Sequence, residues 1–377
     1  MIPLSHLVAS RVVTVSIALA PGLLAMPQVE GRPATPWHPS LDAAMVAAQR
    51  DARPILIYFW AEGSEQCRAF YAETLTAAAA AEELAHFECV SASAEQQLAH
   101  DLIRRFGVKS LPTVVFVDAR GEAEDAIRGR IDLPGFLAQA QRVRRGEGTV
   151  RHWRELAAAA PDDLDVRLTL ATQLEHVGRV AESAELEASI KAADPDGQTV
   201  AGAQLQLYDV FAAIRAGEGD PSLPGTWDLT PLYEHLSHIK PRAVRYEAWY
   251  WIIDVERQRG DRTKERAALA GAWRHATDRS KRATLGFRLI RRYHESDVEL
   301  VEADKHLAQE VLEDLHRLAK EHDQLSTRAY VLHAEALVHA LWGRGAAALA
   351  AAAKAAEVDP DEPIHRELVD ALGGADR

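Results

Sequence analysis

The side chains with the clearest chemical potential lie in the stretch FWAEGSEQC, residues 59–67. It holds one thiol, Cys67, and a serine three residues earlier, Ser64. A cysteine in place of Ser64 would make a dithiol redox site, because disulfide exchange begins with a thiolate that the positive end of a helix stabilises. A serine hydroxyl does not ionise near neutral pH and cannot take over that attack. We therefore expect no ordinary dithiol turnover from this stretch.

A simpler role for Ser64 is to cap the helix predicted over SEQCRAFYAETL, residues 64–75. A serine at the N-cap accepts a backbone N–H bond and contributes about 1 kcal/mol. Glu62 and Glu65 add negative charge, which disfavours a thiolate at Cys67. Two interpretations of Cys67 remain: a small buried residue in the first helical turn, or a single thiol that forms a mixed disulfide with a client.

The second cysteine, Cys89, lies in a predicted interior strand, FECVSA. A strand interior is beyond easy bonding reach of a helix N-terminus, so we expect two free thiols rather than a disulfide. Neither cysteine belongs to a cluster with metal-ligand spacing, and the pair His235 and His238 has no second pair of ligands after it. We expect no metal and no other cofactor.

Residues 37–145 alternate between helix-like and strand-like segments, with apolar runs such as PILIYFW typical of buried strands. The order is helix, then β-α-β-α-β-β-α, which indicates a mixed sheet with helices on both faces. GEGT begins a predicted linker at 146–150. From residue 151 onward every segment reads as helix.

Two of these segments resemble thioredoxin: PILIYFWAEGSEQC, and GVKSLPTVVFVDARG farther along the chain. The preceding WHPSLDAAMVAAQRDARP looks like the leading helix of exported thioredoxin-like domains akin to the last domain of the DsbD reductases. The resemblance implies an α/β thioredoxin-like domain over 37–145 with a cis bond between Leu111 and Pro112. It also implies a shallow peptide-binding groove beside Pro112.

The same resemblance shows where this chain departs from the family pattern. Ser64 stands where the family has its nucleophilic cysteine, and Cys67 stands at the resolving cysteine. Tyr58 occupies the position of a buried aspartate that assists proton transfer in thioredoxin itself. The redox site is thus expected to be vestigial, and the protein is expected not to be a disulfide oxidoreductase.

Two units in the remainder share one pattern: a helix, a Gly-Arg turn, a second helix and a closing Asp-Pro. Their turn glycines are Gly178 and Gly343. The pattern resembles the tetratricopeptide repeat, and it predicts an all-α tetratricopeptide-like helical solenoid over 151–377. The middle units lack the closing Asp-Pro, AGEGDPSLPGTWDLTP is expected to be a loop, and EPIHRELVDAL a polar capping helix.

Stacked helix pairs present a concave surface that commonly binds a peptide or a partner protein. The candidate binding residues are Trp249, Tyr250, Trp251, Trp273, Arg288, Arg291 and Arg292. Aromatic residues at helical spacing can instead pack in a core, and the arginines can form a solvated helix face. Both alternatives stay open at this stage.

The formal net charge of the 377-residue chain is −13, which argues against a nucleic-acid partner. Residues 1–26 combine a positive charge at Arg11 with an apolar run shorter than the roughly 20 residues of a spanning helix. This is typical of a cleaved signal peptide followed by a linker at 27–36. We expect export to the periplasm, with an uncleaved inner-membrane anchor as the alternative.

A serine-for-cysteine thioredoxin domain followed by helical repeats is similar in architecture to the bacterial chaperedoxin family. That similarity implies the holding of unfolded client proteins. The expected function is a redox-inactive adaptor or chaperone-like holdase of the cell envelope, with protein or peptide partners. One alternative is a monothiol disulfide-exchange or redox-sensing protein that uses Cys67. Another is a structural subunit of an envelope complex.

Overall fold

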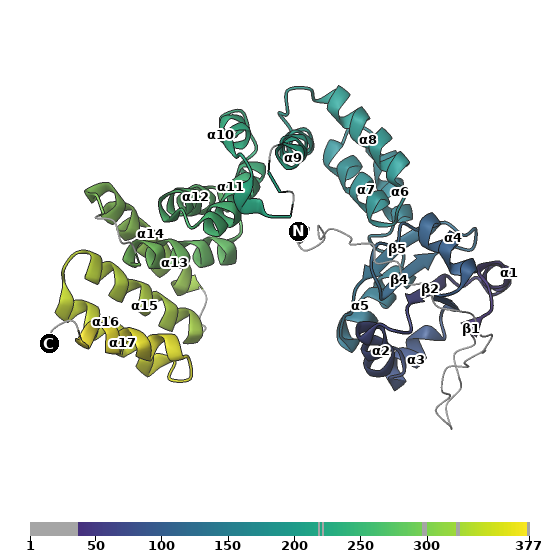
Figure 1. Ribbon diagram of the computed structural model, residues 1–377, viewed down its shortest axis with the longest axis horizontal. Coiled ribbons are helices and arrows are strands. Elements are labelled where there is room, and N and C mark those ends of the chain that lie inside the picture. The colour runs from purple at the N-terminus through teal and green to yellow at the C-terminus, as the bar shows by residue number, and fades with distance from the viewer. Residues whose placement is uncertain (1–36, 218, 221, 296–299, 322–324, 375–377) are drawn as a thin grey trace. The chain divides into compact units, whose positions relative to one another are not determined.

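The structure is a computed structural model that describes residues 37–374, apart from residues 218, 221, 296–299 and 322–324. The predicted signal segment at 1–26 and the linker at 27–36 lie outside the described residues. The described chain divides into two compact units, with the boundary between Pro195 and Asp196 (Figure 1). Each unit is described by itself.

The first unit is built on a five-stranded sheet with the order β1-β3-β2-β4-β5. The strands are β1 (Trp37–His38), β2 (Ile55–Trp60), β3 (Glu88–Ser93), β4 (Thr113–Val117) and β5 (Ala123–Arg128). The first three run parallel, β4 is antiparallel to β2, and β5 is antiparallel to β4. The predicted mixed sheet is confirmed, and β1 is an addition too short to leave a sequence pattern.

Helices cover both faces of this sheet, as predicted. Side chains of α1 (Leu41–Asp51) and α4 (Gln97–Arg105) pack with Ile55, Ile57 and Phe59 on one face. The opposite face carries Leu56 and Tyr58 and is covered by α2 (Glu65–Phe70), the π-helical turn η2 (Tyr71–Leu75), α3 (Ala78–Leu84) and α5 (Leu133–Arg144). The alternation along β2 follows from the two-residue period of a strand. Helix α3, an alanine run without apolar periodicity, was not predicted.

Three further helices belong to the first unit: α6 (Val150–Ala159), α7 (Leu164–His176) and α8 (Val180–Ala193). Leu170, Leu174 and Val177 of this segment share one hydrophobic core with the α1 and α4 face of the sheet. Thr149, in the predicted linker, is buried and caps α6. The chain therefore changes from mixed to helical structure near residue 150, whereas the first compact unit continues to Pro195.

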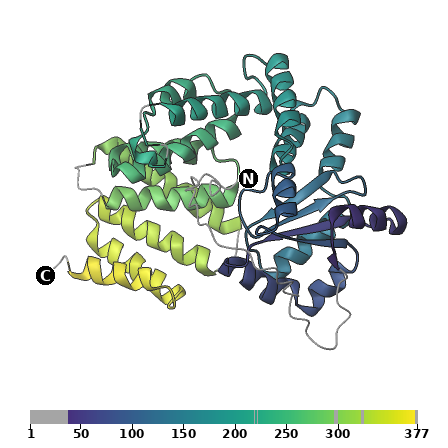
Figure 2. The ribbon, with the colours of Figure 1, turned by 45° about the vertical axis from the view of Figure 1, so that its right-hand side comes forward.

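The second unit is entirely helical in its described part. Its elements are α9 (Val200–Ala216), the 3₁₀ turn η3 (Pro224–Thr226), α10 (Thr230–Leu236), α11 (Arg242–Arg259), α12 (Arg262–His275), α13 (Arg279–His294), α14 (Glu302–Glu321), α15 (Leu325–Leu341), α16 (Gly345–Val358) and α17 (Pro363–Gly374). Successive hairpins stack from α11 to α17 as in a helical solenoid, around one continuous core (Figures 1 and 2). The assignment of these helices to the tetratricopeptide family stays a prediction.

Several predicted boundaries match the observed ones. The leading helix occupies 41–51 as expected, and its N-cap, Ser40, accepts a bond from the backbone N–H of Ala43. Part of the expected loop after α9 forms η3 and the start of α10. Within the described part of the chain, no helix has both the length and the apolar character that crossing a membrane requires.

Candidate functional site

Ser64 lies at the N-cap of α2, as predicted from the sequence. Its backbone is extended, and its Oγ accepts a hydrogen bond from the backbone N–H of Cys67 at 3.3 Å. The hydroxyl therefore satisfies one of the backbone donors that the first turn of a helix leaves without an intrahelical partner. This geometry is that of a structural cap.

Cys67 is 1% exposed, in the first turn of α2. Its backbone carbonyl accepts a bond from the hydroxyl of Tyr58 at 3.0 Å, and the Tyr58 ring packs 5.9 Å from the ring of Phe70. Burial raises the pKa of Tyr58, so its phenol remains a neutral donor. Tyr58 thus links β2 to α2. The interpretation of Cys67 as a buried residue is confirmed.

The second thiol is likewise buried. Cys89 lies in β3 at 0% exposure, and burial raises the pKa of its thiol. Both cysteines are free, as expected from the strand and helix positions that the sequence predicted for them.

The rim of the site is acidic. Glu62, Gly63 and Glu65 are exposed around Ser64. The carboxylate of Glu95 accepts bonds from the backbone N–H of Glu62, at 2.9 Å, and from the hydroxyl of Ser93. Burial opposes ionisation of Glu95, yet these hydrogen bonds keep its pKa below the ordinary value. Negative charge beside the helix N-terminus disfavours a thiolate there.

The cis bond between Leu111 and Pro112, which the thioredoxin resemblance implied, is present. Pro112 is buried, and its carbonyl accepts a bond from the backbone N–H of Gly129 at 2.8 Å. The proline loop is therefore joined directly to the segment that follows β5. Whether this region binds a peptide stays a prediction.

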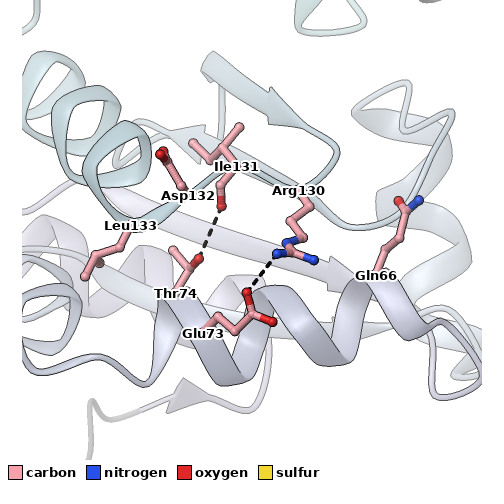
Figure 3. Close-up of a pocket in the computed structure, with 7 residues that line it drawn as sticks. All are labelled: Gln66, Glu73, Thr74, Arg130, Ile131, Asp132 and Leu133. Carbon is pink, nitrogen blue, oxygen red and sulfur yellow. Dashed lines mark hydrogen bonds and ion pairs between the residues drawn. The ribbon is translucent and has the colours of Figure 1, made fainter. Parts of the chain in front are cut away.

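A polar pocket of about 390 Å³ opens between the α2–η2 helix and the start of α5 (Figure 3). It is lined by Gln66, Glu73, Thr74, Arg130, Ile131, Asp132 and Leu133. Arg130 and Glu73 point toward each other and form an ion pair at 2.8 Å, and the Thr74 hydroxyl donates to the Ile131 carbonyl. This pocket was not predicted from the sequence, and Pro112, beside which a groove was expected, is not among the residues that line it. Its two walls are far apart in the chain, so no local pattern marks it.

Helices α6 and α7 cover the outer edge of β5. The backbone carbonyls of Glu124 and Ala126 accept bonds from Gln173 Nε2 and His176 Nε2, at 3.4 and 2.8 Å. Arg128 donates to the carbonyl of His176 at 2.6 Å. An uncovered edge strand is a template for pairing with another chain. Here that edge is occupied by the protein's own helices, so a client strand cannot add to the sheet beside β5.

A buried carboxylate reinforces this contact. Asp125 is 4% exposed and accepts bonds from Arg142 and from Gln173 Nε2, the latter at 3.0 Å. Nearby, Gly107 and Gly178 lie backbone to backbone: a Cβ on Gly178 would be 2.6 Å from the carbonyl carbon of Phe106. The hairpin α7–α8, which turns at Gly178, is therefore an integral part of the first unit.

The four aromatic candidates of the second unit differ in accessibility. Trp273 is 2% exposed, so it belongs to the core and does not line a binding surface. The ring of Trp249 packs on Gly271, and Trp251 stacks on Tyr208 with the ring centroids 6.0 Å apart. Tyr250, at 39% exposure, keeps the most surface for a partner. Core packing thus explains Trp273 and much of Trp249 and Trp251.

The three arginine candidates share helix α13. Arg291 and Arg292 each form an ion pair with Glu295 at 2.6 Å, and Arg292 also contacts Glu265 at 3.2 Å. Arg288 is half-buried. The charges of Arg291 and Arg292 are already neutralised within the unit, so a carboxylate ligand would have to compete with these glutamates.

A match to a known protein family covers β1–β4 of the first unit. Residues 36–119 match the protein family described as thioredoxin-like. The chain is similar to a thioredoxin from Thermus thermophilus, with 28% identity over 28% of this chain and 85% of that chain, at a TM-score of 0.27. It is also similar to a DsbH oxidoreductase, with 16% identity over 32% of this chain and 94% of that chain, at a TM-score of 0.27.

A third similar structure is the reduced C-terminal domain of DsbD from Neisseria meningitidis. The identity is 21% over 27% of this chain and 92% of that domain, at a TM-score of 0.25. No curated protein matches the chain. The chain carries an N-terminal thioredoxin-like domain followed by an all-helical region.

Proposed function

We propose that this protein is a redox-inactive, protein-binding adaptor or chaperone-like holdase of the cell envelope. The observation that carries the proposal is the pair Ser64 and Cys67. The Ser64 hydroxyl caps the helix at the position where a dithiol site has its nucleophilic cysteine, and the thiol of this stretch, Cys67, is 1% exposed.

The physical argument concerns the first step of disulfide exchange. That step needs an ionised sulfur that can approach the substrate disulfide in line. Ser64 supplies no sulfur, and Cys67 is buried in the first turn of α2. The carboxylates of Glu62, Glu65 and Glu95 further disfavour a thiolate at this helix end. The domain keeps the thioredoxin-like scaffold without the group that performs exchange.

Two features support protein binding. A pocket remains beside α2, open to solvent and lined by polar side chains and by Ile131 and Leu133. The second unit stacks its helices around a continuous core, an arrangement that commonly presents an extended surface to peptides or proteins. The proposed location is the periplasm, because residues 1–26 have the composition of a signal peptide.

The test compares binding with redox chemistry on the same preparation. The mature protein is assayed for suppressing the aggregation of a chemically unfolded model protein and for reducing insulin in the presence of dithiothreitol. A Cys67→Ser variant serves as the matched control. We expect aggregation to be suppressed equally by both proteins, and no insulin reduction above the rate with dithiothreitol alone.

Affinity capture of envelope proteins separates the alternatives. Partners that leave with detergent and are held equally by the Cys67→Ser variant support an adaptor or holdase. Partners that leave only with reductant, and that the variant fails to hold, would show instead that Cys67 is a working monothiol. One partner that co-purifies at fixed stoichiometry would indicate a structural subunit.

A further inference from the structure

A buried pair of histidines joins helix α15 to the last helix, α17. His333 is 3% exposed and His365 is 0% exposed, and their Nδ1 atoms lie 3.0 Å apart. A neutral imidazole carries one proton on its two nitrogens. A hydrogen bond between two Nδ1 atoms therefore requires that one ring donates and the other accepts. The contact is specific to a protonation state in which at least one of the two rings is neutral.

The surroundings of the pair offer little to stabilise added charge. The ring of Phe287 lies 5.4 Å from that of His333, and the ring of Tyr330 lies 5.2 Å from that of His365. The Nε2 atom of His365 is buried and has no hydrogen-bond partner. Because Nε2 has no acceptor, the favoured neutral tautomer of His365 carries its proton on Nδ1 and donates it to His333. A second proton would then place an N–H on Nε2 in an enclosed space without an acceptor, which is costly.

Charged and titratable groups face the pair from the neighbouring elements. On the α13 side, Arg291 and His294 oppose a positive charge on His333. At the turn between α16 and α17, Asp359 and Glu362 favour a positive charge on His365, and Glu362 also accepts a bond from the Tyr330 hydroxyl.

Burial outweighs these acidic neighbours. It lowers the pKa of His365, and it lowers the pKa of His333 to about 4, with the proximity of His365 as the second cause.

We propose that the contact between His333 and His365 is an acid-sensitive latch, which holds α17 on the helical stack near neutral pH and releases it in a mildly acidic medium. Double protonation turns both Nδ1 atoms into donors that face each other across 3.0 Å. It also places two positive charges in a buried site, which the closed arrangement cannot accommodate.

Release would uncover apolar surface at the end of the stack. Leu368 of α17 is buried in the same core as Ala351 and Ala352 of α16, and Val369 and Leu372 pack against it. Opening of α17 therefore exposes an alanine-rich face together with the helix's own leucines. The use of this surface for client binding rests on the function proposed above, whereas the latch itself does not.

The direction of the pH effect follows from the two pKa values. In the open state both histidines regain an ordinary pKa near 6.5, whereas in the closed state both values are lower. The open state therefore binds more protons between about pH 6.5 and pH 4. Stability of the closed state is complete above this window and falls as the pH decreases through it. Two protons taken up on opening raise the open population by up to about 100-fold for each pH unit.

The test is hydrogen exchange of the full chain at pH 7 and pH 5, normalised for the pH dependence of the intrinsic exchange rate. We expect protection of α17 to fall by on the order of 100-fold, while α11 and α12 keep theirs. A His365→Asn variant, whose amide does not titrate, should lose most of this response, as should His333→Asn. His238→Asn removes an exposed histidine of the same unit and should leave the response unchanged.

Three results would overturn the latch. The first is unchanged protection of α17 at pH 5, and the second is a uniform loss over all helices of the unit. The third is a response that survives in both asparagine variants. If either variant fails to keep α17 folded at pH 7, the test is the slope of α17 protection against pH in the wild-type protein. A slope that corresponds to the uptake of one proton or less contradicts a paired site. Aggregation suppression measured at both pH values then tests the link to client binding separately.

Discussion

Two helical hairpins of this protein share one sequence pattern and have different structural surroundings. The hairpin α7–α8 turns at Gly178 and the hairpin α15–α16 turns at Gly343, both with positive φ angles, of +85° and +69°. A side chain on Gly178 would collide with the backbone of Phe106, whereas nothing lies within 4 Å of the Cβ position at Gly343. The first hairpin is docked on a thioredoxin-like sheet, and the second is stacked between other helices.

The difference shows what such a repeat pattern determines. It specifies two helices and a left-handed turn residue, because these depend on neighbours in the sequence. It does not specify the partner against which the hairpin packs. In the first hairpin the outward polar side chains Gln173 and His176 meet the carbonyls of β5. In the second, His333 meets the histidine of a capping helix.

Truncation of the chain is expected to have the largest effect on the first unit. A chain ending at residue 149 lacks α6–α8 and exposes the core positions that Leu170, Leu174 and Val177 cover. We expect it to be largely unfolded or aggregated by circular dichroism and gel filtration. A chain ending at residue 195 should fold with a cooperative transition. A folded, monomeric chain ending at 149 would contradict the shared core.

The two turn glycines provide a matched pair of substitutions. Gly178→Ala adds a backbone collision to an unfavourable φ angle, and we expect it to lower the free energy of unfolding of the first unit by about 3 kcal/mol. Gly343→Ala adds only the unfavourable φ angle, and we expect about 1 kcal/mol. Urea unfolding of the full chain, followed by hydrogen exchange of each hairpin, measures both. Equal losses would remove the distinction between the hairpins.

The buried carboxylate of Asp125 tests the contact between the first hairpin and β5. Asp125→Asn weakens the contacts with Arg142 and Gln173 in an enclosed site, and we expect a loss of about 2 kcal/mol. Asp254→Asn, in an exposed ion pair with Arg257, should cost less than about 0.5 kcal/mol. Thermal unfolding of the two variants in parallel compares them. A larger loss for Asp254→Asn would contradict the importance of the β5 edge.

The smallest expected effect concerns the cap of α2. Ser64→Ala removes the acceptor for the N–H of Cys67 and should cost about 1 kcal/mol without changing any redox property. Ser64→Cys restores a dithiol spacing, and we expect a disulfide with Cys67 that thiol labelling before and after reduction detects. If Ser64→Ala alters thiol exchange, the hydroxyl has a chemical role that a cap does not explain.

The sequence predicted the local parts of this structure well. The leading helix and the cap at Ser64 depend on residues a few positions apart, and both are observed. The burial of Cys67, one of two interpretations that the sequence left open, depends on how α2 packs on the sheet. The pocket at Arg130 and Glu73, the covered edge of β5 and the contact of His333 with His365 were not predicted. Their partners lie 32 or more positions apart, so they depend on how separate elements pack.

Helical spacing alone also did not predict which aromatic residues are buried and which are exposed. Trp273 and Tyr250 lie on the neighbouring helices α12 and α11, yet the first is buried and the second is the most exposed of the four candidates. Only the placement of the adjacent helices separates them. The export signal at 1–26 lies outside the described residues, and the periplasmic location stays a prediction.

The most direct test of the central claim measures the reactivity of Cys67 in the native protein. A Cys89→Ala variant leaves one thiol, and its reaction with an aromatic disulfide reagent is followed with and without urea. We predict a native rate at least about 100-fold below the unfolded rate, because the thiol is buried. A native rate that equals or exceeds the unfolded rate would show an exposed, activated thiol and contradict a redox-inactive domain.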